Sequence, residues 1–254
     1  MFRPRIIPVL LLRNKALVKS IKFKNYQYIG DPINAVRIFN DLKADELVFL
    51  DILASKEHRT ISLKFIEEVG EEANMPFSVG GGIRSLNSIQ EILSTGAEKV
   101  RINQFAIENP NFIKDASDNF GSSTIMVCID VKKNYLNRTK VWSKSNKKFT
   151  KYSPVDFAKL MEEKGAGEII IQSVNRDGTK SGYDLNLLRR ISENVSIPVT
   201  ALGGASDLEN MKQAYEQSYV NGLAAGSMFV FQGAHRGVLI NYPEKNVIKQ
   251  LFDH

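Results

Sequence analysis

The sequence predicts an α/β protein, namely a (β/α)8 or TIM barrel built from two similar half-barrels. Short apolar runs alternate with amphipathic stretches along the chain, and eight strands that alternate with helices indicate a closed parallel sheet. The length of 254 residues matches a single barrel of this kind. No linker-like stretch divides the chain, so we expect one domain over residues 1–254.

A repeat at nearly half the chain length supports the two half-barrels. The segment G-G-I-R-S-L at residues 81–86 matches G-G-A-S-D-L at residues 203–208, an offset of 122 residues. The same offset places residues 101–103 on residues 223–225. An open, doubly wound sheet gives no reason for such a repeat, whereas a barrel of two similar halves does.

The predicted elements follow from apolar runs and from helix-start signals. The strands are expected over residues 5–12, 47–52, 77–79, 99–102, 124–129, 168–172, 199–202 and 222–225. Helices are expected from Pro32 onward, from Ser85 to 93, and over residues 61–69, 110–116, 154–164, 185–194, 208–217 and 244–251. Asp31 and Ser85 suit helix caps, and Pro32 suits a first helical position. We expect a long polar loop over residues 13–31 and a charged hairpin over residues 132–151.

Composition excludes several classes of function. The net charge is +6, but Lys and Arg are scattered apart from one concentration at residues 132–151, and no basic stripe with stacking aromatics indicates nucleic-acid binding. The charge then belongs to a solvated face or attracts anionic substrates. No apolar run or signal peptide indicates a membrane or secreted protein, and the single Cys128 sits in an apolar run, so we expect a cytoplasmic protein. The histidines share no ligand spacing with acidic residues, so we predict no metal and no cofactor.

Paired glycines after strands are the main functional signal. In each repeat, a strand ends in glycines shortly before a helix begins, so backbone N–H groups and a helix N-terminus can converge on a phosphate. Gly203, Gly204, Ala225, Gly226 and Ser227 suit the phosphate site that barrels form after strands seven and eight, and Gly81, Gly82 and Asn103 suit a second one. The alternative is that these glycines only form tight turns. Two such motifs favour a ligand with two phosphates or similar anions.

Three carboxylates stand where the barrel mouth is expected. Asp51 and Asp130 each end a strand, and Asp177 lies in the loop after the sixth strand. A carboxylate there can act as a general acid or base if apolar surroundings raise its pKa. Each can instead hold a loop by hydrogen bonds.

Four charged residues are expected at the opposite end of the barrel. Arg5, Glu46, Lys99 and Glu168 each occupy the first residue of a strand or the one before it. Two cations and two carboxylates can neutralise one another there. They form either a structural ring of ion pairs or a gate on the barrel axis.

Five segments resemble the cyclase subunit (HisF) family of imidazole glycerol phosphate synthase, over essentially the whole chain. They are R-I-I-P at residues 5–8, D-E-L-V-F-L-D-I at 45–52, V-G-G-G-I-R at 79–84, G-A-G-E-I at 165–169 and N-R-D-G-T-K-S-G-Y-D at 175–184. The last motif is highly specific, whereas the glycine runs also occur in other phosphate-binding barrels.

The resemblance implies a partner, a substrate and residue roles. The bottom of such a barrel docks on a HisH-like glutaminase, and ammonia passes the gate of Arg5, Glu46, Lys99 and Glu168 toward a substrate with two phosphates. One phosphate is implied at Gly82 and Asn103, and the other at Asp177, Gly178, Gly204 and Ala225, beside Gly226. Asp130 is implied as a catalytic acid or base, and Lys19 as a loop residue that closes over the substrate. A dry conduit would keep ammonia unprotonated and nucleophilic.

The chain departs from the family at the mouth. The family uses aspartates on the first and fifth strands, but Leu11 stands where the first is expected. Leucine cannot move a proton, so the two-carboxylate mechanism lacks a partner. Gln104 replaces a small hydroxyl residue, and Ala225 to Ser227 alter the second phosphate loop. This pattern resembles a paralogous branch in which the barrel and a glutaminase supply ammonia to a sugar amidotransferase for surface polysaccharide or flagellin glycan.

Three functions remain open from the sequence. The first is an ammonia-conducting subunit for sugar amidination, which we prefer. The second is an authentic cyclase of histidine biosynthesis in which a neighbouring residue replaces the lost aspartate. The third is a non-catalytic scaffold that activates the glutaminase by binding alone.

Overall fold

The computed structural model describes residues 3–233 and 235–252, so the outermost residues of the expected domain lie outside it. In the described part, eight parallel strands close into a barrel, which confirms the predicted fold class. They are β1 (Arg5–Arg13), β4 (Leu47–Asp51), β5 (Phe77–Gly80), β6 (Lys99–Ile102), β7 (Ile125–Lys133), β10 (Glu168–Ser173), β11 (Val199–Leu202) and β12 (Gly222–Ala225). Their order is β10-β11-β12-β1-β4-β5-β6-β7, and pairing of β7 with β10 closes the sheet.

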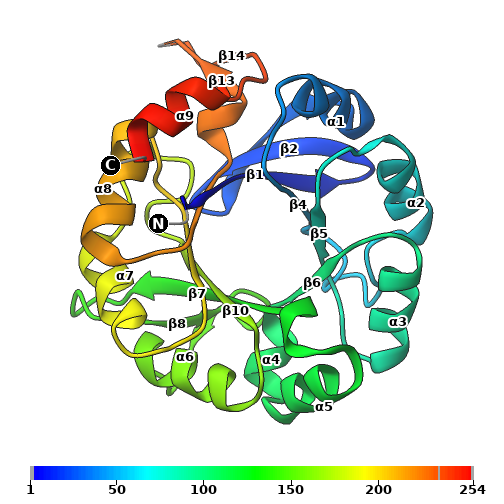
Figure 1. Ribbon diagram of the computed structural model, residues 1–254. Coiled ribbons are helices and arrows are strands. Elements are labelled where there is room, and N and C mark those ends of the chain that lie inside the picture. The colour runs from blue at the N-terminus through cyan, green and yellow to red at the C-terminus, as the bar shows by residue number, and fades with distance from the viewer. Residues whose placement is uncertain (1–2, 234, 253–254) are drawn as a thin grey trace.

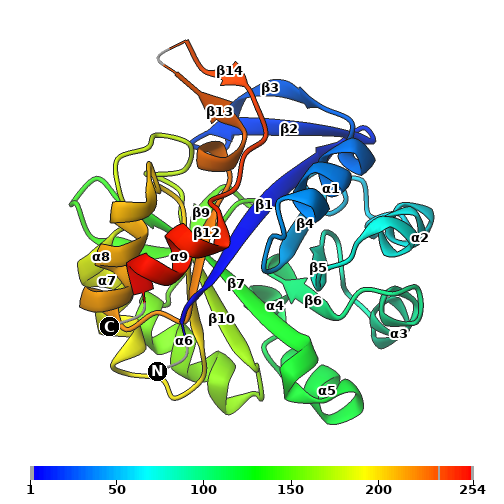
Figure 2. The same ribbon diagram turned by 45° about the horizontal axis from the view of Figure 1, so that its top comes forward.

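Helices form a ring outside the barrel (Figures 1 and 2). They are α1 (Pro32–Asp41), α2 (Leu63–Glu72), α3 (Leu86–Ser94), α4 (Gln104–Glu108), α5 (Asn111–Phe120), α6 (Pro154–Glu163), α7 (Leu185–Ser192), α8 (Leu208–Ser218) and α9 (Lys245–Phe252). Both predicted caps are confirmed: Asp31 accepts from the backbone N–H of Asn34 at 2.9 Å, and Ser85 from that of Ser88 at 3.2 Å. Each cap satisfies a backbone donor that the helix itself leaves free.

Two apolar layers follow from the alternation of side chains along each strand. The larger layer lies between the strands and the helices and contains Phe39, Phe49 and Ile89, all fully buried. The smaller layer fills the barrel interior. It consists of Ile7, Val9, Val48, Met126, Cys128, Ile170, Leu202 and Ala224, with Leu11 and Leu50 packed against it. The middle of the barrel axis is therefore surrounded by apolar side chains.

The loop predicted over residues 13–31 is wrong, because this segment forms a hairpin. Strands β2 (Ala16–Ile21) and β3 (Lys24–Gly30) pair with each other, and β2 also pairs with the end of β1. Asn14, Lys15, Lys22 and Phe23 have φ between 51° and 64°. Two-residue hairpin turns favour such angles and usually contain glycine, so these turns could not be recognised from the residue types alone.

The charged hairpin predicted over residues 132–151 is confirmed. The end of β7 pairs with β8 (Thr139–Ser143), which pairs in turn with β9 (Lys148–Phe149). A further small hairpin joins β13 (Phe231–Gln232) and β14 (Gly237–Val238), and 3-10 turns cover Ser122–Thr124 and Ser227–Phe229. None of the described helices is long and apolar enough to span a membrane.

Candidate functional site

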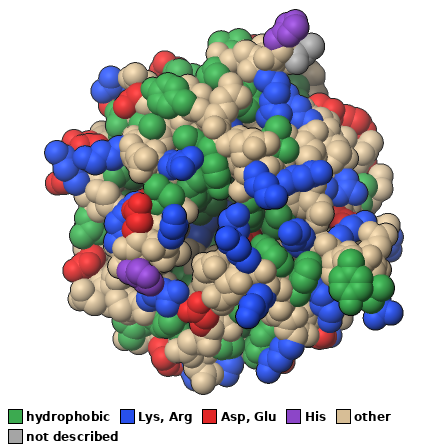
Figure 3. Space-filling view, turned by 180° about the vertical axis from the view of Figure 1, so that it is seen from behind, with side chains coloured by type: hydrophobic (Ala, Val, Ile, Leu, Met, Phe, Trp, Pro, Cys, Tyr) green, Lys and Arg blue, Asp and Glu red, His purple; other side chains and the backbone are tan. Residues whose placement is uncertain are grey.

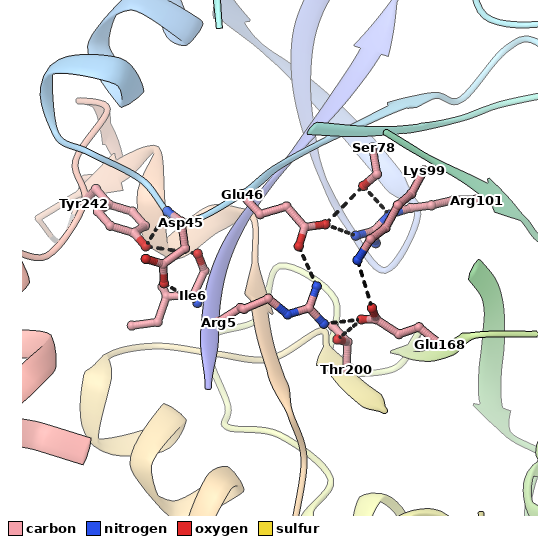
Figure 4. A network of polar contacts seen from close by, with 10 residues as sticks. All are labelled: Arg5, Ile6, Asp45, Glu46, Ser78, Lys99, Arg101, Glu168, Thr200 and Tyr242. Atoms are coloured by element: carbon pink, nitrogen blue, oxygen red, sulfur yellow. Dashed lines mark hydrogen bonds and ion pairs between the residues drawn. The ribbon is translucent and has the colours of Figure 1, made fainter. Parts of the chain in front are cut away.

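The four charges predicted at one end of the barrel lie together there (Figure 4). The guanidinium of Arg5 bonds Glu46 at 2.6 Å and Glu168 at 2.8 Å, and Lys99 Nζ lies 3.7 Å from Glu168. Both carboxylates are buried, while Arg5 and Lys99 keep about a third of their side chains exposed. We call these residues, together with Arg101, the ionic cluster.

The two glutamates also raise the pKa of Arg5, although its burial alone would lower it. Thr200 donates its hydroxyl to Glu168 at 2.5 Å, and Ser78 donates to Glu46 at 3.3 Å. Each carboxylate therefore has several donors, as a buried charge requires. Both carboxylates of the cluster are thus satisfied by ion pairs and hydrogen bonds inside the barrel.

Arg101 is the member of the cluster that the sequence analysis missed. Its Nη2 lies 3.5 Å from Glu46, and its Nε donates to Ser78 at 2.9 Å. Because strand residues alternate, the inward orientation of Lys99 already implied that Arg101 also points inward. The apolar neighbours Val100 and Ile102 made the segment look like an ordinary buried strand.

A cavity of about 530 Å³ opens at the other end of the barrel, and the residues predicted at the mouth all line it. They are Lys19, Asp51, Gly82, Asn103, Asp130, Asp177, Gly178, Gly204, Ala225 and Gly226. Its floor includes apolar side chains of the interior layer, among them Val9, Leu11 and Leu202. Figure 3 views this end and shows a hollow bordered by Lys and Arg side chains.

Cationic residues of the rim were not singled out as site residues from the sequence. Arg84, Lys56, Lys144 and Lys147 line the cavity, two of them from the hairpin segment after β8. Their charge suits an anionic ligand, because a concave site focuses the field of the charges that line it.

Asp130 is the mouth carboxylate best suited to move a proton. It lies at the mouth end of β7 and is only 5% exposed. Burial raises its pKa to about 7, while a hydrogen bond from the Asn103 side chain opposes this rise. A carboxyl group that titrates near neutral pH can both donate and accept a proton there.

Asp51 and Asp177 are held by other contacts. Asp51 accepts from the backbone N–H groups of Leu53 and Ala54 at 3.0 and 3.1 Å and pairs with Arg59 at 2.5 Å. This geometry supports the loop-holding alternative for Asp51.

Asp177 fastens the β2–β3 hairpin to the loop after β10. It accepts from the Ser20 hydroxyl at 3.1 Å, from the backbone N–H of Phe23 at 3.4 Å and from Gln172 at 3.2 Å. Burial raises the pKa of Asp177 against these donors. One carboxylate oxygen therefore bonds the hairpin, at Ser20 and Phe23, and the other bonds Gln172 of β10.

Lys19 lies in strand β2 and not in a loop, which corrects the expectation from the resemblance. It is 5% exposed, and its Nζ donates to the carbonyl of Val9. Burial lowers the pKa of Lys19 to about 8, while Asp177 opposes this change. The ammonium group is already inside the mouth, beside Gly226.

Gly82 and Gly204 occupy the same place in the two half-barrels. Both have positive φ, 69° and 112°. A Cβ on Gly82 would lie 1.8 Å from the carbonyl oxygen of Arg59, and one on Gly204 would lie 2.1 Å from that of Gly182. The fold itself thus requires glycine at both positions, whether or not a phosphate binds beside them.

The described residues contain no group of three or more His, Cys, Asp and Glu that could hold a metal ion. Cys128 is buried in the interior layer, where burial raises the pKa of its thiol to about 12. It is therefore a poor nucleophile at neutral pH.

Comparison with known proteins places the whole chain among close relatives. Residues 5–236 match the family described as histidine biosynthesis protein. The chain is 41% identical to the imidazole glycerol phosphate synthase subunit HisF of Alkaliphilus metalliredigens, over 90% of this chain and 91% of the relative. It is 45% identical to a protein of Leptospira interrogans provisionally named subunit HisF, over 99% and 100%, and 44% identical to one of Pseudomonas aeruginosa provisionally named subunit hisF2, over 97% and 98%.

Proposed function

The chain belongs to the histidine biosynthesis family and is HisF-like, and on this premise we propose that it conducts ammonia from a glutaminase to an anionic substrate. The glutaminase is HisH-like and docks at the end of the barrel that carries the ionic cluster. Ammonia enters past Arg5, Glu46, Lys99 and Glu168 and reaches the mouth through the apolar interior. The apolar lining keeps water away, so that ammonia stays unprotonated.

The observation that carries this proposal is the contrast between the two ends of the barrel. At the entrance, the charges form a complete network of ion pairs. At the mouth, Leu11 lines the same cavity as Asp130, so the expected carboxylate of the first strand is missing. Burial raises the pKa of Asp130 to about 7, but a single carboxyl group cannot act as the acid and as the base in the same step, as two carboxylates can.

We propose further that the acceptor of the ammonia is a phosphate-bearing acetamido sugar, whose acetamido group a sugar amidotransferase converts to an acetamidino group. The amide oxygen is activated by a nucleoside triphosphate that this enzyme binds, and it leaves with the transferred phosphoryl or nucleotidyl group as the ammonia nitrogen bonds to the carbon. The glycine loops and the cationic rim suit a phosphate-bearing ligand. On this proposal, the protein acts in the synthesis of surface polysaccharide or flagellin glycan. The P. aeruginosa and L. interrogans relatives carry only provisional names as synthase subunits, which is compatible with a branch whose substrate has changed.

The competing function is the ring closure of histidine biosynthesis. One observation favours it: Asp177 lines the same mouth, has a raised pKa and interacts electrostatically with Asp130. Against it, the oxygens of Asp177 are engaged by Ser20, Phe23 and Gln172. Asp177 is thus committed to holding the hairpin.

Two experiments separate the functions. We expect the purified protein, given the histidine-pathway substrate and ammonium salts, to produce no imidazole glycerol phosphate, and we expect no complementation of a histidine auxotroph that lacks HisF. Ring closure at normal rates would establish the competing function. A Leu11→Asp variant tests whether the missing carboxylate explains the absence of ring closure. It restores the expected carboxylate and should gain measurable ring closure. Leu50→Asp, at the neighbouring cavity position, is the control and should not.

The scaffold hypothesis predicts a different pattern. If the barrel only activated the glutaminase, Asp130→Asn would leave the yield of the pathway product unchanged. We expect that variant to reduce the yield while glutamine hydrolysis continues.

A further inference from the structure

Arg101 occupies a place on the barrel axis between the entrance and the mouth. It follows Lys99 and precedes Asn103 on the inward face of β6, and its side chain is 1% exposed. In Figure 4 it lies among the residues of the ionic cluster, next to Ser78. Within the described part of the chain, it is the member of the cluster that also lines the mouth cavity. Arg101 therefore connects the two ends of the proposed route.

Arg101 changes the charge of the entrance. The cluster now holds three cations, Arg5, Lys99 and Arg101, against the carboxylates Glu46 and Glu168. Burial lowers the pKa of Arg101, while Glu46 and Glu168 raise it, and guanidinium groups stay protonated in proteins. The cluster thus carries a net positive charge of one. In an apolar surrounding, this charge strongly repels any further cation that enters.

One nitrogen of this guanidinium has no partner. Nε bonds Ser78 and Nη2 pairs with Glu46, whereas Nη1 is buried and has no hydrogen-bond acceptor among residues 3–233 and 235–252. Buried donors are nearly always satisfied, and leaving one unpaired is costly. An orphaned donor of this kind, on a residue that lines a cavity, indicates a small ligand that supplies the acceptor.

The chemistry of the group limits what that ligand is. Guanidinium only donates hydrogen bonds, so its ligand needs a lone pair and no positive charge. Neutral ammonia has one lone pair, whereas ammonium has none and is repelled by the charge. We propose that Nη1 of Arg101 is a relay site that binds neutral ammonia between the ionic cluster and the mouth cavity, a proposal that rests on the ammonia-conducting function proposed above.

The test uses the barrel in complex with its glutaminase and the acceptor enzyme, and measures the ratio of final product to glutamate. Arg101→Met removes both charge and donor at similar length, Arg101→Lys keeps the charge, and Arg101→Gln keeps a neutral donor. The control is Lys64→Met on α2, whose side chain is 83% exposed. We expect Arg101→Met to lower the ratio about tenfold, the order of the loss of one hydrogen bond to a charged group, with glutamate formation unchanged.

The variants distinguish a relay from a structural role. Arg101→Gln should retain more coupling than Arg101→Met, and saturating ammonium salt added outside should restore product formation in both, because it enters at the mouth. A wild-type ratio in Arg101→Met would overturn the inference. Failure of the ammonia-conducting function itself would look different, since the wild-type complex would then give no glutamine-dependent product.

A second measurement keeps the inference testable if these variants fold poorly. The side-chain resonances of Arg101 in the wild-type protein are followed by nitrogen-15 NMR during addition of ammonium chloride. We expect them to shift at a pH above the pKa of ammonium, where neutral ammonia is abundant, and to stay fixed well below it and during addition of potassium chloride. If addition of ammonium chloride shifted these resonances at neither pH, only water would occupy the site, and the inference would be overturned.

Discussion

At the scale of single residues, Asp130 links the chemistry of the mouth to stability. Its carboxyl group is buried among apolar side chains, and this burial raises its pKa to about 7. The folded protein therefore holds this proton more tightly than the unfolded chain, whose carboxyl groups titrate near pH 4. The contribution to stability is present at low pH and is lost as the pH rises from about 4 to about 7.

We expect Asp130→Asn to remove that loss. Relative to wild type, the variant should gain on the order of 2 kcal/mol of unfolding free energy between pH 5 and pH 8. Urea denaturation at the two pH values measures this difference. Asp41→Asn, at an exposed position at the end of α1, is the control and should show no such gain. A parallel pH dependence of wild type and Asp130→Asn would contradict the raised pKa.

The contacts of Glu46 allow us to predict how much unfolding free energy its removal costs. It receives Arg5 at 2.6 Å and Arg101 at 3.5 Å, and both cations lose their closest carboxylate when it is removed. Glu46→Ala should therefore destabilise the protein by about 3–5 kcal/mol, as for one partner of a buried ion pair. Urea unfolding measures the loss.

The matched control is Glu72→Ala, which breaks the largely exposed pair between Arg37 and Glu72. Such pairs contribute about 1 kcal/mol or less. Equal losses for Glu46→Ala and Glu72→Ala would show that the ionic cluster is no stronger than a surface pair.

At the scale of elements, the β2–β3 hairpin depends on one carboxylate in a distant loop. Asp177 accepts from Ser20 and from the backbone of Phe23, and the carbonyl of Asp177 accepts from the backbone N–H of Lys22 at 3.0 Å. Asp177→Ala keeps the backbone carbonyl but removes the side-chain bonds to Ser20 and Phe23. It should therefore raise amide hydrogen exchange in residues 16–30 about tenfold, because the hairpin can then open locally. Exchange in the barrel strands should not change.

Tyr26→Phe is the control within the same hairpin. It removes only an exposed hydrogen bond of 3.1 Å to the carbonyl of Phe23. Exchange that stays slow in Asp177→Ala would mean that pairing with β1 alone holds the hairpin in place.

The elements also show what the sequence can and cannot predict. The barrel strands were predictable because each is a short apolar run bounded by polar residues, and the clustering of Arg5, Glu46, Lys99 and Glu168 followed from their positions at strand starts. The β2–β3 hairpin was not, since its turns use left-handed residues such as Lys22 and Phe23 without glycine. Side-chain contacts decide such cases, and these form only in the folded chain.

The site was predictable to a similar degree. Positions at strand ends placed the right residues around one cavity, but they did not separate the carboxylate left for chemistry from those held by neighbours. Asp51 pairs with Arg59, and Asp177 holds the hairpin. Burial raises the pKa of Asp130 to about 7. That distinction depends on burial and partners, which strand position does not fix.

At the scale of the whole molecule, the barrel separates two polar ends by an apolar interior. Apart from Arg101, which also lines the cavity, the ionic cluster lies at the amino ends of the strands and the cavity at their carboxyl ends, with Val48, Met126 and Ile170 among the residues between them. Figure 2 shows the β2–β3 and β13–β14 hairpins together at one end of the barrel, and Figure 3 shows the hollow bordered by cations at that end. A neutral nucleophile can cross such an interior, whereas an ion is disfavoured.

Isotope competition tests this account most directly. The barrel, its glutaminase and the sugar amidotransferase are supplied with glutamine labelled with nitrogen-15 in the side-chain amide, in a buffer that contains an equal concentration of unlabelled ammonium. We predict that the amidino product carries nitrogen-15 in nearly every molecule, because ammonia passes inside the barrel without mixing with the solvent. A product in which labelled and unlabelled nitrogen are present in the same proportions as in the bulk solution would contradict the account.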